Sequence, residues 1–355
     1  MSESKPVTSA RSERDEGFVS RRGFIRVVAA LTGGLLLPTC SPESRSLGYR
    51  PKPRDTTFIT ANEDFYLVAV DPSYRPALTP ANVNAQWSLE LVGLGGTAKR
   101  FGYDELSTRA QRNILYTFEC IGNPVGGQLI GNAKWQALPL KALLTTAPGG
   151  LAKARAVMFE GLDGFYSSVS IERATDDYAF IALRMNDAPL PPAHGFPARV
   201  ILPDLYGMKQ PRWLRRAVLL QSADTSSYWE KRGWGGEVPV KTMSRFDPRP
   251  DLPNDKPAAL TGTAFAGARG VQKVEVSLDE GRSWATCELV TPERANAWSL
   301  WRYDWRKPVP GAHTLQVRAT DGNGTVQSAR RRDAFPDGAT GYDQLQLTIT
   351  TEARL

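Results

Sequence analysis

The most informative segment of this 355-residue sequence reads Tyr116-Thr-Phe-Glu-Cys120-Ile-Gly-Asn-Pro124. It continues through the glycine pair Gly126-Gly127 and ends at Asn132-Ala-Lys-Trp135. Residues 114–118 are apolar and β-prone, so they predict a short strand that leads into a Gly/Asn/Pro loop with Cys120 on its rim. Such a loop can approach a bound group closely, because glycine has no Cβ and asparagine tolerates left-handed backbone.

The residue type alone allows three interpretations of Cys120. A lone cysteine after a hydrophobic strand is most often a small buried residue. A thiolate on the rim of a loop can also be a soft ligand for a metal. As a nucleophile, in the manner of a thiol hydrolase, it would need a base, and the candidates are His194 with Asp163 or Asp187.

The composition limits the classes of function. The length predicts about two domains. The net charge of +7 is spread thinly, and the basic clusters at residues 212–216 and 330–332 indicate solvated surface, so no nucleic-acid partner is expected. The only histidines are His194 and His313, and there is no Cys-x-x-Cys-His sequence, so neither a haem domain nor a histidine-based zinc site is expected.

The N-terminus predicts export. Ser20-Arg21-Arg22-Gly23-Phe24-Ile25-Arg26 is followed by apolar residues 27–37, which is typical of a twin-arginine signal. A transmembrane helix needs about 20 apolar residues, and this run has roughly half that number. We therefore predict a signal peptide at residues 1–40, the twin-arginine translocon as a partner and a periplasmic mature protein. Proline and threonine in Leu37-Pro-Thr-Cys40 disfavour a lipid anchor at Cys40.

The rest of the chain predicts an α+β protein of two domains. Residues 41–57 and the proline-rich residues 239–257 indicate linkers. A mixed α/β domain is expected at residues 58–238, with strands and helices as follows: strands at 65–70, 87–94, 114–118, 156–160, 166–171, 180–184, 200–203 and 217–221, and helices at 103–106 and 138–145. An immunoglobulin-like β-sandwich is expected at residues 258–355, with these strands: 259–265, 272–277, 285–289, 298–303, 313–320 and 345–350.

Three blocks, in this order along the chain, resemble the sulfite oxidase family of molybdopterin oxidoreductases. The Glu-Cys-x-Gly-Asn and Ala-x-Trp pattern around Cys120 resembles the family's molybdenum-ligand loop. Met185-Asn186 with His194-Gly-Phe-Pro-Ala-Arg199 resembles its pterin-phosphate segment. Val274-Glu-Val-Ser-Leu-Asp-Glu-Gly-Arg-Ser-Trp284 with Arg318-Ala-Thr-Asp-Gly322 resembles its dimerisation domain.

The resemblance implies a molybdenum-molybdopterin cofactor and assigns roles around it. Cys120 is the implied protein ligand of the metal, and Trp135 is the implied catalytic residue beside it. The residues implied to bind the cofactor are Asn62, Tyr66, Cys120, Asn123, His194, Arg199 and Lys209. Arginine and lysine suit this task, because they are the usual partners of phosphate.

The resemblance also implies partners. The reaction needs a small-molecule substrate and, since no haem motif is present, a separate electron carrier such as a periplasmic cytochrome c or a membrane quinone-linked subunit. The sandwich domain implies a homodimer.

The substrate is where the sequence departs from the family pattern. Sulfite-oxidising members carry cationic side chains at the positions of Val68, Val70 and Val125, and a tyrosine at the position of Leu183. Sulfite is a dianion and would need several of those cations. We therefore expect oxygen-atom transfer with a neutral or less charged substrate, such as a sulfoxide or another S- or N-oxide. The alternative is a sulfite-oxidase-like scaffold that binds or supports other molecules without redox catalysis.

Overall fold

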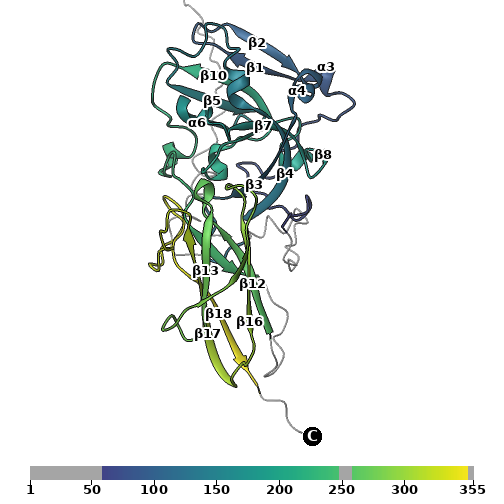
Figure 1. Cartoon of the computed structure of the whole chain (residues 1–355). Helices are drawn as coiled ribbons and strands as arrows, with labels where there is room; N and C mark the ends of the chain where they lie inside the picture. Colours follow the sequence, from purple (N-terminus) through teal and green to yellow (C-terminus); the bar gives the residue numbers. More distant parts are fainter. Residues whose placement is uncertain (1–57, 248–257, 351–355) are drawn as a thin grey trace, which may run out of the picture. The chain divides into compact units, whose positions relative to one another are not determined.

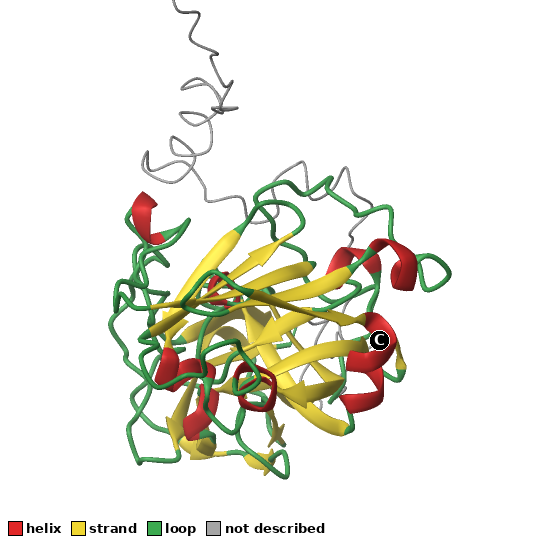
Figure 2. Cartoon of the chain, turned by 90° about the horizontal axis from the view of Figure 1, so that it is seen from above, coloured by secondary structure: helices red, strands yellow, loops and turns green. Residues whose placement is uncertain are grey.

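The computed structural model describes residues 58–247 and 258–350, which belong to one compact unit, Tyr49–Leu355. The predicted signal peptide, with Cys40, and the first predicted linker lie outside the described residues. Strands predominate and the helices are short, as Figure 2 shows. Among the described residues, none of the helices combines the length and the apolar character needed to cross a lipid bilayer.

The first domain is built on two sheets of five strands each (Figure 1). The first sheet has the order β2-β1-β10-β5-β6, with these bounds: β1 Ser88–Val92, β2 Ala98–Gly102, β5 Ala156–Gly161, β6 Tyr166–Ser170 and β10 Leu214–Leu220. Strands β1 and β10 are parallel, and the other neighbours are antiparallel. The second sheet has the order β3-β4-β7-β8, with β9 paired to β7, and these bounds: β3 Arg112–Glu119, β4 Ile130–Pro139, β7 Phe180–Met185, β8 Ala188–Pro189 and β9 Arg199–Ile201.

Short helices connect these strands and the sandwich that follows. They are α3 Val83–Gln86, α4 Tyr103–Arg109, α5 Leu140–Leu144, α6 Ile171–Ala174, and the 3-10 turns η1 Pro192–His194, η2 Gly207–Lys209, η3 Glu230–Arg232 and η4 Gly267–Arg269. The helix α4 has acidic residues in its first turn and Arg109 in its last, which complements the helix dipole. The helix α5 buries Leu140, Leu143 and Leu144.

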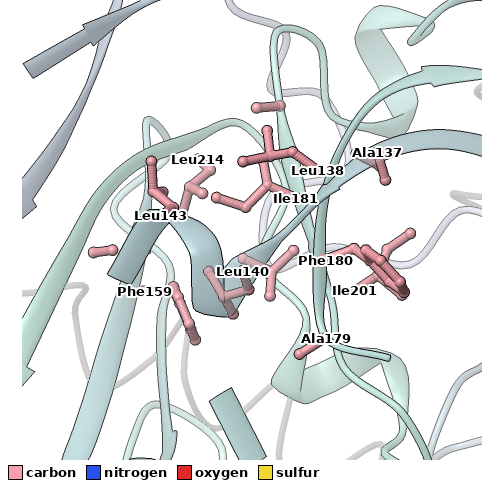
Figure 3. Close-up of a cluster of buried hydrophobic side chains, with 14 of the residues drawn as sticks. Ala137, Leu138, Leu140, Leu143, Phe159, Ala179, Phe180, Ile181, Ile201 and Leu214 are labelled. Carbon is pink, nitrogen blue, oxygen red and sulfur yellow. The ribbon is translucent and has the colours of Figure 1, made fainter. Parts of the chain in front are cut away.

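A continuous apolar core joins both sheets to α5. Figure 3 shows Leu140 and Leu143 of α5 together with Phe159 of β5, Ile181 of β7 and Ile201 of β9. All five side chains are fully buried. Burying one such side chain contributes about 1.5–3 kcal/mol, so this core supplies the rigid base on which the loops at the strand ends are held.

The second domain is a β-sandwich of two four-stranded sheets. Their orders are β11-β12-β16-β15 and β14-β13-β17-β18, with these bounds: β11 Met243–Phe246, β12 Ala258–Phe265, β13 Val271–Ser277, β14 Ala285–Thr286, β15 Glu288–Val290, β16 Ser299–Trp305, β17 Gly311–Asp321 and β18 Asp343–Ile349. Its core includes Leu260, Trp301, Leu315 and Val317. The predicted class, a mixed domain followed by a sandwich, is confirmed, with strands in the majority.

The prediction of a strand at residues 65–70 is wrong. Only Phe65 is buried there, while Val68 and Val70 are 47% and 45% exposed, so the apolar residues do not share a core-facing side. The carbonyl oxygen of Val68 accepts a hydrogen bond from a side chain, Arg212 Nη2, at 2.9 Å. The segment is an extended loop that runs past the sheet without joining it.

Three other expectations need correction. Residues 132–135, for which no element was predicted, belong to β4 and pair with β3, and β4 delays the start of the next helix from residue 138 to Leu140. The predicted linker at 239–257 contains β11, which pairs with β12 despite the surrounding prolines. The predicted strand at 285–289 is divided into β14 and β15, which belong to different sheets.

Hydrogen bonds join the two domains next to strand β3. The backbone N–H of Thr117 donates to the carbonyl oxygen of Asn296 at 2.8 Å. The Thr117 hydroxyl accepts from the N–H of Trp298 at 2.9 Å. The strand that leads to Cys120 is therefore supported by the second domain.

Candidate active site

Cys120 directly follows β3 and begins a tight loop. Its N–H donates to the carbonyl oxygen of Leu129 at 2.9 Å, and its carbonyl oxygen accepts from the N–H of Asn123 at 2.9 Å. The residue is half-buried. Burial raises the pKa of the thiol to about 11, with a smaller opposing effect from the N–H of Gly122 and a further increase from Glu119. Without an added positive charge the thiol is therefore protonated at neutral pH.

Asn123 is used to shape this loop. Its Oδ1 accepts from the N–H of Leu129 at 2.9 Å, and its Nδ2 donates to Glu119 Oε1 at 3.0 Å. Glu119 is buried, which raises its pKa to about 7, and its Oε2 has no hydrogen-bond partner. A side chain on Gly127 would overlap Asn123 Oδ1, so glycine is needed for this close approach. Both polar atoms of the Asn123 side chain already make hydrogen bonds within the loop. The predicted contact with a pterin would therefore have to use the second Nδ2 hydrogen or the second lone pair of Oδ1.

His194 and Asn62 are brought together by the turn η1. His194 Nε2 lies 2.8 Å from the carbonyl oxygen of Asn62. A carbonyl oxygen only accepts, so Nε2 carries the proton and Nδ1 is an acceptor. Burial lowers the pKa of His194 to about 4, and the nearby guanidiniums of Arg199, Arg212 and Arg75 also favour the neutral ring. The Asn62 side chain accepts from Asn186 Nδ2 at 2.8 Å.

Two guanidiniums, that of the buried Arg199 and that of the partly buried Arg212, lie near His194 without a carboxylate partner. Arg199 donates to the carbonyl oxygen of His194 at 3.2 Å, and its Nε has no partner. Arg212 donates to the carbonyl oxygens of Ala193 and Val68 at 2.8 and 2.9 Å. Burial lowers the pKa of Arg199 to about 9, with repulsion from Arg212 as the next cause, and lowers the pKa of Arg212 to about 10. Among the described carboxylates none is within ion-pair distance of either arginine, so the pair is prepared for an anion.

Gly195 separates these two arginines. Its φ is +118°, which side chains rarely adopt. A Cβ placed on it would lie 3.1 Å from the Cβ of Arg199 and 3.2 Å from that of Arg212. Glycine is therefore required both by the backbone and by the narrow space between the two arginine stems.

Tyr66 follows Phe65 in the extended loop, and the charges of Cys120, Arg199 and Arg212 act on its hydroxyl. Its ring stacks on Phe65 with centroids 5.6 Å apart. Burial raises the pKa of its hydroxyl well above the usual value, and the charges that act on it next are those of Cys120 and Arg199. Its hydroxyl makes no hydrogen bond with any part of the chain that the structure describes.

The side chains of Trp135 and Lys209 are both fully buried. Trp135 is fully buried, and its indole N–H donates to the carbonyl oxygen of Tyr116 at 3.1 Å. It packs beneath Arg199, whose guanidinium carbon is 5.3 Å from its ring centroid. Lys209 is 1% exposed and forms an ion pair with Glu230. In this structure Trp135 is a wall of the site, and the charge of Lys209 is already neutralised.

The thiol-hydrolase reading finds no support in this geometry. His194 is bonded to the Asn62 carbonyl and not to Cys120. Asp187 forms an ion pair with Lys134 at 2.7 Å, and Asp163 accepts the N–H of Phe165 at 3.1 Å. A nucleophilic cysteine needs an adjacent base and a lowered pKa, and Cys120 has neither.

Comparisons with known proteins agree with this arrangement. Residues 77–229 match the oxidoreductase molybdopterin binding domain, and residues 247–333 match the Mo-co oxidoreductase dimerisation domain. Chicken sulfite oxidase is 30% identical over 321 residues, which cover 76% of this chain and 68% of that protein. The chain belongs to the sulfite oxidase family. Human mitochondrial sulfite oxidase is also 30% identical, and the match covers 80% of this chain and 60% of the human protein.

More distant matches share the fold or part of the sequence. An inducible NADH nitrate reductase of soybean is 26% identical over 301 residues, which cover 66% of this chain and 34% of that enzyme. The crystal structure of the sulfane dehydrogenase SoxCD from Paracoccus pantotrophus superimposes with a TM-score of 0.73 at 20% identity, covering 85% of this chain and 84% of that one. At that identity the likeness shows the fold alone.

Membership of the sulfite oxidase family implies molybdenum-molybdopterin as the cofactor, and the residues present fit it. Among the described residues no three histidine, cysteine, aspartate or glutamate side chains gather as a metal site. A single thiol, Cys120, suits a metal whose remaining soft ligands come from the pterin. The partnerless Nε of Arg199 and the nearby Arg212 suit the anionic end of the cofactor.

Three residues of this site were not among the predicted ones. Arg212 belongs to a basic cluster that the sequence suggested was solvated, and only the fold shows that it turns inward. Asn186 belongs to the Met185-Asn186 pair on which the family resemblance partly rests, and that pair could have identified it as a site residue. Its side chain donates to the carbonyl oxygen of Thr60 and to Asn62 Oδ1. Glu119 precedes the cysteine at the end of β3 and is buried. Nothing in the sequence around it predicted this burial.

Proposed function

We propose that this member of the sulfite oxidase family transfers an oxygen atom between water and a small substrate that is less charged than sulfite. The net reaction is substrate + H₂O ⇌ oxidised substrate + 2 electrons + 2 protons, with the electrons carried by a separate redox protein. The observation that carries the proposal is a molybdopterin-binding domain in which Cys120 begins the loop after β3, while Arg199 and Arg212 lie near His194 without a carboxylate partner.

The residues of the chain have distinct tasks in this proposal. Cys120 would hold the metal as a thiolate, and Arg199 and Arg212 would hold the phosphate of the pterin. The cofactor supplies a metal that changes oxidation state while an oxygen atom is passed. The neutral His194, fixed by Asn62, offers its Nδ1 as an acceptor. The stack of Phe65 on Tyr66 keeps the loop that carries them in place.

Support for a less charged substrate comes from the residues at the rim. Val68 and Val70, where sulfite-oxidising members carry cations, are nearly half exposed and contribute no charge. Leu183, at the family's tyrosine position, is 1% exposed and belongs to the core, so it does not line an open pocket. A doubly charged anion would gain little at such a rim.

The proposed setting follows the sequence predictions. Export by the twin-arginine pathway would place the folded, cofactor-loaded protein in the periplasm. A periplasmic cytochrome c or a quinone-linked membrane subunit would then exchange electrons with it. The match to the dimerisation domain supports a homodimer.

The first test is the cofactor itself. Molybdenum and pterin are measured in protein from a molybdopterin-competent host, for the wild type, Cys120→Ser and the control Cys287→Ser in the sandwich core. We expect near-stoichiometric metal in the wild type and the control, and an altered molybdenum EPR spectrum in Cys120→Ser. Metal and pterin missing from all three would instead support the scaffold without redox catalysis.

The substrate class is tested by steady-state kinetics. Dimethyl sulfoxide and trimethylamine N-oxide with reduced benzyl viologen are compared with sulfite and ferricyanide. We expect turnover of at least one oxide and weak turnover of sulfite. A low-micromolar Michaelis constant for sulfite would contradict the proposal.

A further inference from the structure

The hydroxyl group of Tyr66 has a defined position next to Cys120. Tyr66 lies in the loop after Phe65, and its phenol oxygen rests against Gly207 of η2. A Cβ placed on Gly207 would be 2.9 Å from Tyr66 Oη and 3.5 Å from the carbonyl oxygen of Glu119. Glu119 directly precedes Cys120, so the phenol oxygen lies beside the backbone that carries the predicted metal ligand.

The Tyr66 hydroxyl makes no hydrogen bond that would stabilise the described part of the fold. Tyr66 is partly buried, yet within residues 58–247 and 258–350 its Oη has no hydrogen-bond partner. Phenylalanine would keep the stacking on Phe65, so the hydroxyl is available to something that is not part of the described chain.

Other hydroxyls close to the cysteine loop are already occupied. Tyr116 Oη donates to the carbonyl oxygen of Leu202 at 2.5 Å. Tyr206 Oη accepts the N–H of Lys241 at 3.1 Å. Thr117 Oγ1 is bonded to Asn132 and Trp298. Tyr66 is therefore the phenol among these whose oxygen neither donates nor accepts a hydrogen bond within the described chain, and the family's tyrosine position is a buried leucine.

We propose that Tyr66 is a substrate-binding residue whose hydroxyl donates a hydrogen bond to the oxygen atom of a neutral S- or N-oxide. The proposal rests on the proposed function, and it moves Tyr66 from the cofactor-binding role implied by the resemblance to the substrate side of the site. A neutral donor matches an uncharged, polarised oxygen better than it matches a dianion, which would call for cations. The reduced product has no such oxygen, so the bond discriminates between the two.

The hydroxyl remains a donor over the working pH range. Burial raises its pKa well above the ordinary tyrosine value, and the charge of Cys120 acts in the same direction, against the opposing effect of Arg199. The role proposed here needs only the neutral hydroxyl and no titration.

The test compares Tyr66→Phe with the wild type in molybdenum-loaded protein. Tyr178→Phe is the matched control, because Tyr178 is 40% exposed and its hydroxyl only accepts a long bond of 3.4 Å from Arg294. Two quantities are measured. The first is kcat/KM for dimethyl sulfoxide and trimethylamine N-oxide. The second is the calorimetric Kd of dimethyl sulfone, an unreactive compound whose oxygen atoms accept hydrogen bonds. We expect Tyr66→Phe to lose roughly 10- to 100-fold in kcat/KM and about 10-fold in sulfone affinity with unchanged metal content.

A second variant displaces the hydroxyl without removing it. Gly207→Ala places a methyl group against Tyr66 Oη, at a position whose backbone accepts alanine, and should lower kcat/KM and sulfone affinity in the same direction. Unchanged kinetics and sulfone binding in loaded Tyr66→Phe would overturn the inference. Loss of molybdenum in Tyr66→Phe would also overturn it, because Tyr66 would then hold the cofactor.

The wild type separates this inference from the proposed function. A wild type that contains molybdenum but neither reduces the oxides nor binds the sulfone overturns the Tyr66 inference and the expected oxide turnover, and leaves the cofactor part of the proposed function standing. A wild type without molybdenum and pterin overturns both.

Discussion

The guanidinium of Arg245, in the sandwich, donates a hydrogen bond of 2.8 Å to the carbonyl oxygen of Gly127 in the loop that follows Cys120. Arg245 is 1% exposed and also donates to Thr263 Oγ1 at 2.9 Å. Next to this contact Gly126 has φ +72°, and a side chain there would overlap the carboxylate of Asp343. The second domain thus fixes the shape of the cysteine loop, in addition to any part it has in dimerisation.

Replacing Arg245 with methionine should loosen this loop. Hydrogen bonds to charged groups contribute about 1.5–3 kcal/mol each, so we expect a loss of at least about 2 kcal/mol in the free energy of unfolding, together with weaker retention of molybdenum. Urea unfolding and metal content after dialysis measure the two effects. Arg302→Met is the control, because the ion pair of Arg302 with Asp304 is half exposed and should matter by less than about 1 kcal/mol. Equal losses in both variants would mean that the contact with Gly127 has no special importance.

Gly195→Ala should disturb the two arginines of the predicted phosphate site. The positive φ alone costs about 1–2 kcal/mol, and the new methyl group would also press on the stems of Arg199 and Arg212. Gly149→Ala separates the two effects, since Gly149 also has a positive φ of +82° but nothing within 4 Å of its Cβ position. We expect both variants to lose stability in urea and only Gly195→Ala to lose pterin. Normal pterin content in Gly195→Ala would argue against phosphate binding between these arginines.

Much of the fold was predictable because strands such as β17 and β18 alternate between inward and outward side chains, and sequence periodicity reports local structure. The errors arose where a partner distant in sequence decides the outcome. Residues 65–70 look like a strand but have no neighbouring strand to pair with, and β11 exists only because β12 lies beside it. The cysteine could be picked out from its loop, whereas the inward turn of Arg212 depends on the carbonyls of Ala193 and Val68.

The environment of Lys209 also depends on a partner that is distant in sequence, and this pair leads to a double-mutant prediction. Its partner Glu230 is 21 residues away, and the pair is buried, with side-chain exposures of 1% and 12%. Removing one member of a buried pair usually costs about 3–5 kcal/mol, so Lys209→Met and Glu230→Gln should each destabilise strongly in urea unfolding. The double variant should recover most of that loss, because neither charge is left alone. If Lys209→Met kept its stability and lost only the pterin, Lys209 would serve the cofactor as the resemblance implies.

His194 should make the protein acid-sensitive in a defined window. An unfolded histidine titrates near pH 6.5, whereas burial lowers the pKa of His194 in the folded chain to about 4. Between these values only the unfolded chain binds this proton, so stability falls as the pH is lowered from about 6.5 to 4, by up to about 3 kcal/mol. The measurement is urea unfolding of cofactor-free wild type and His194→Gln at several pH values and constant ionic strength.

Glutamine has no proton to gain in this range, so the stability advantage of the wild type over His194→Gln should shrink as the pH falls through the window. At pH 7 the variant should be the less stable of the two, because it loses the packing of the imidazole on Phe65, whose ring centroid is 5.5 Å away. The other acid-titrating groups are shared by both proteins and cancel in the difference. A difference that stays constant from pH 7 to 4 would mean that His194 accepts its proton in the folded state, and that burial and the nearby arginines do not hold it neutral.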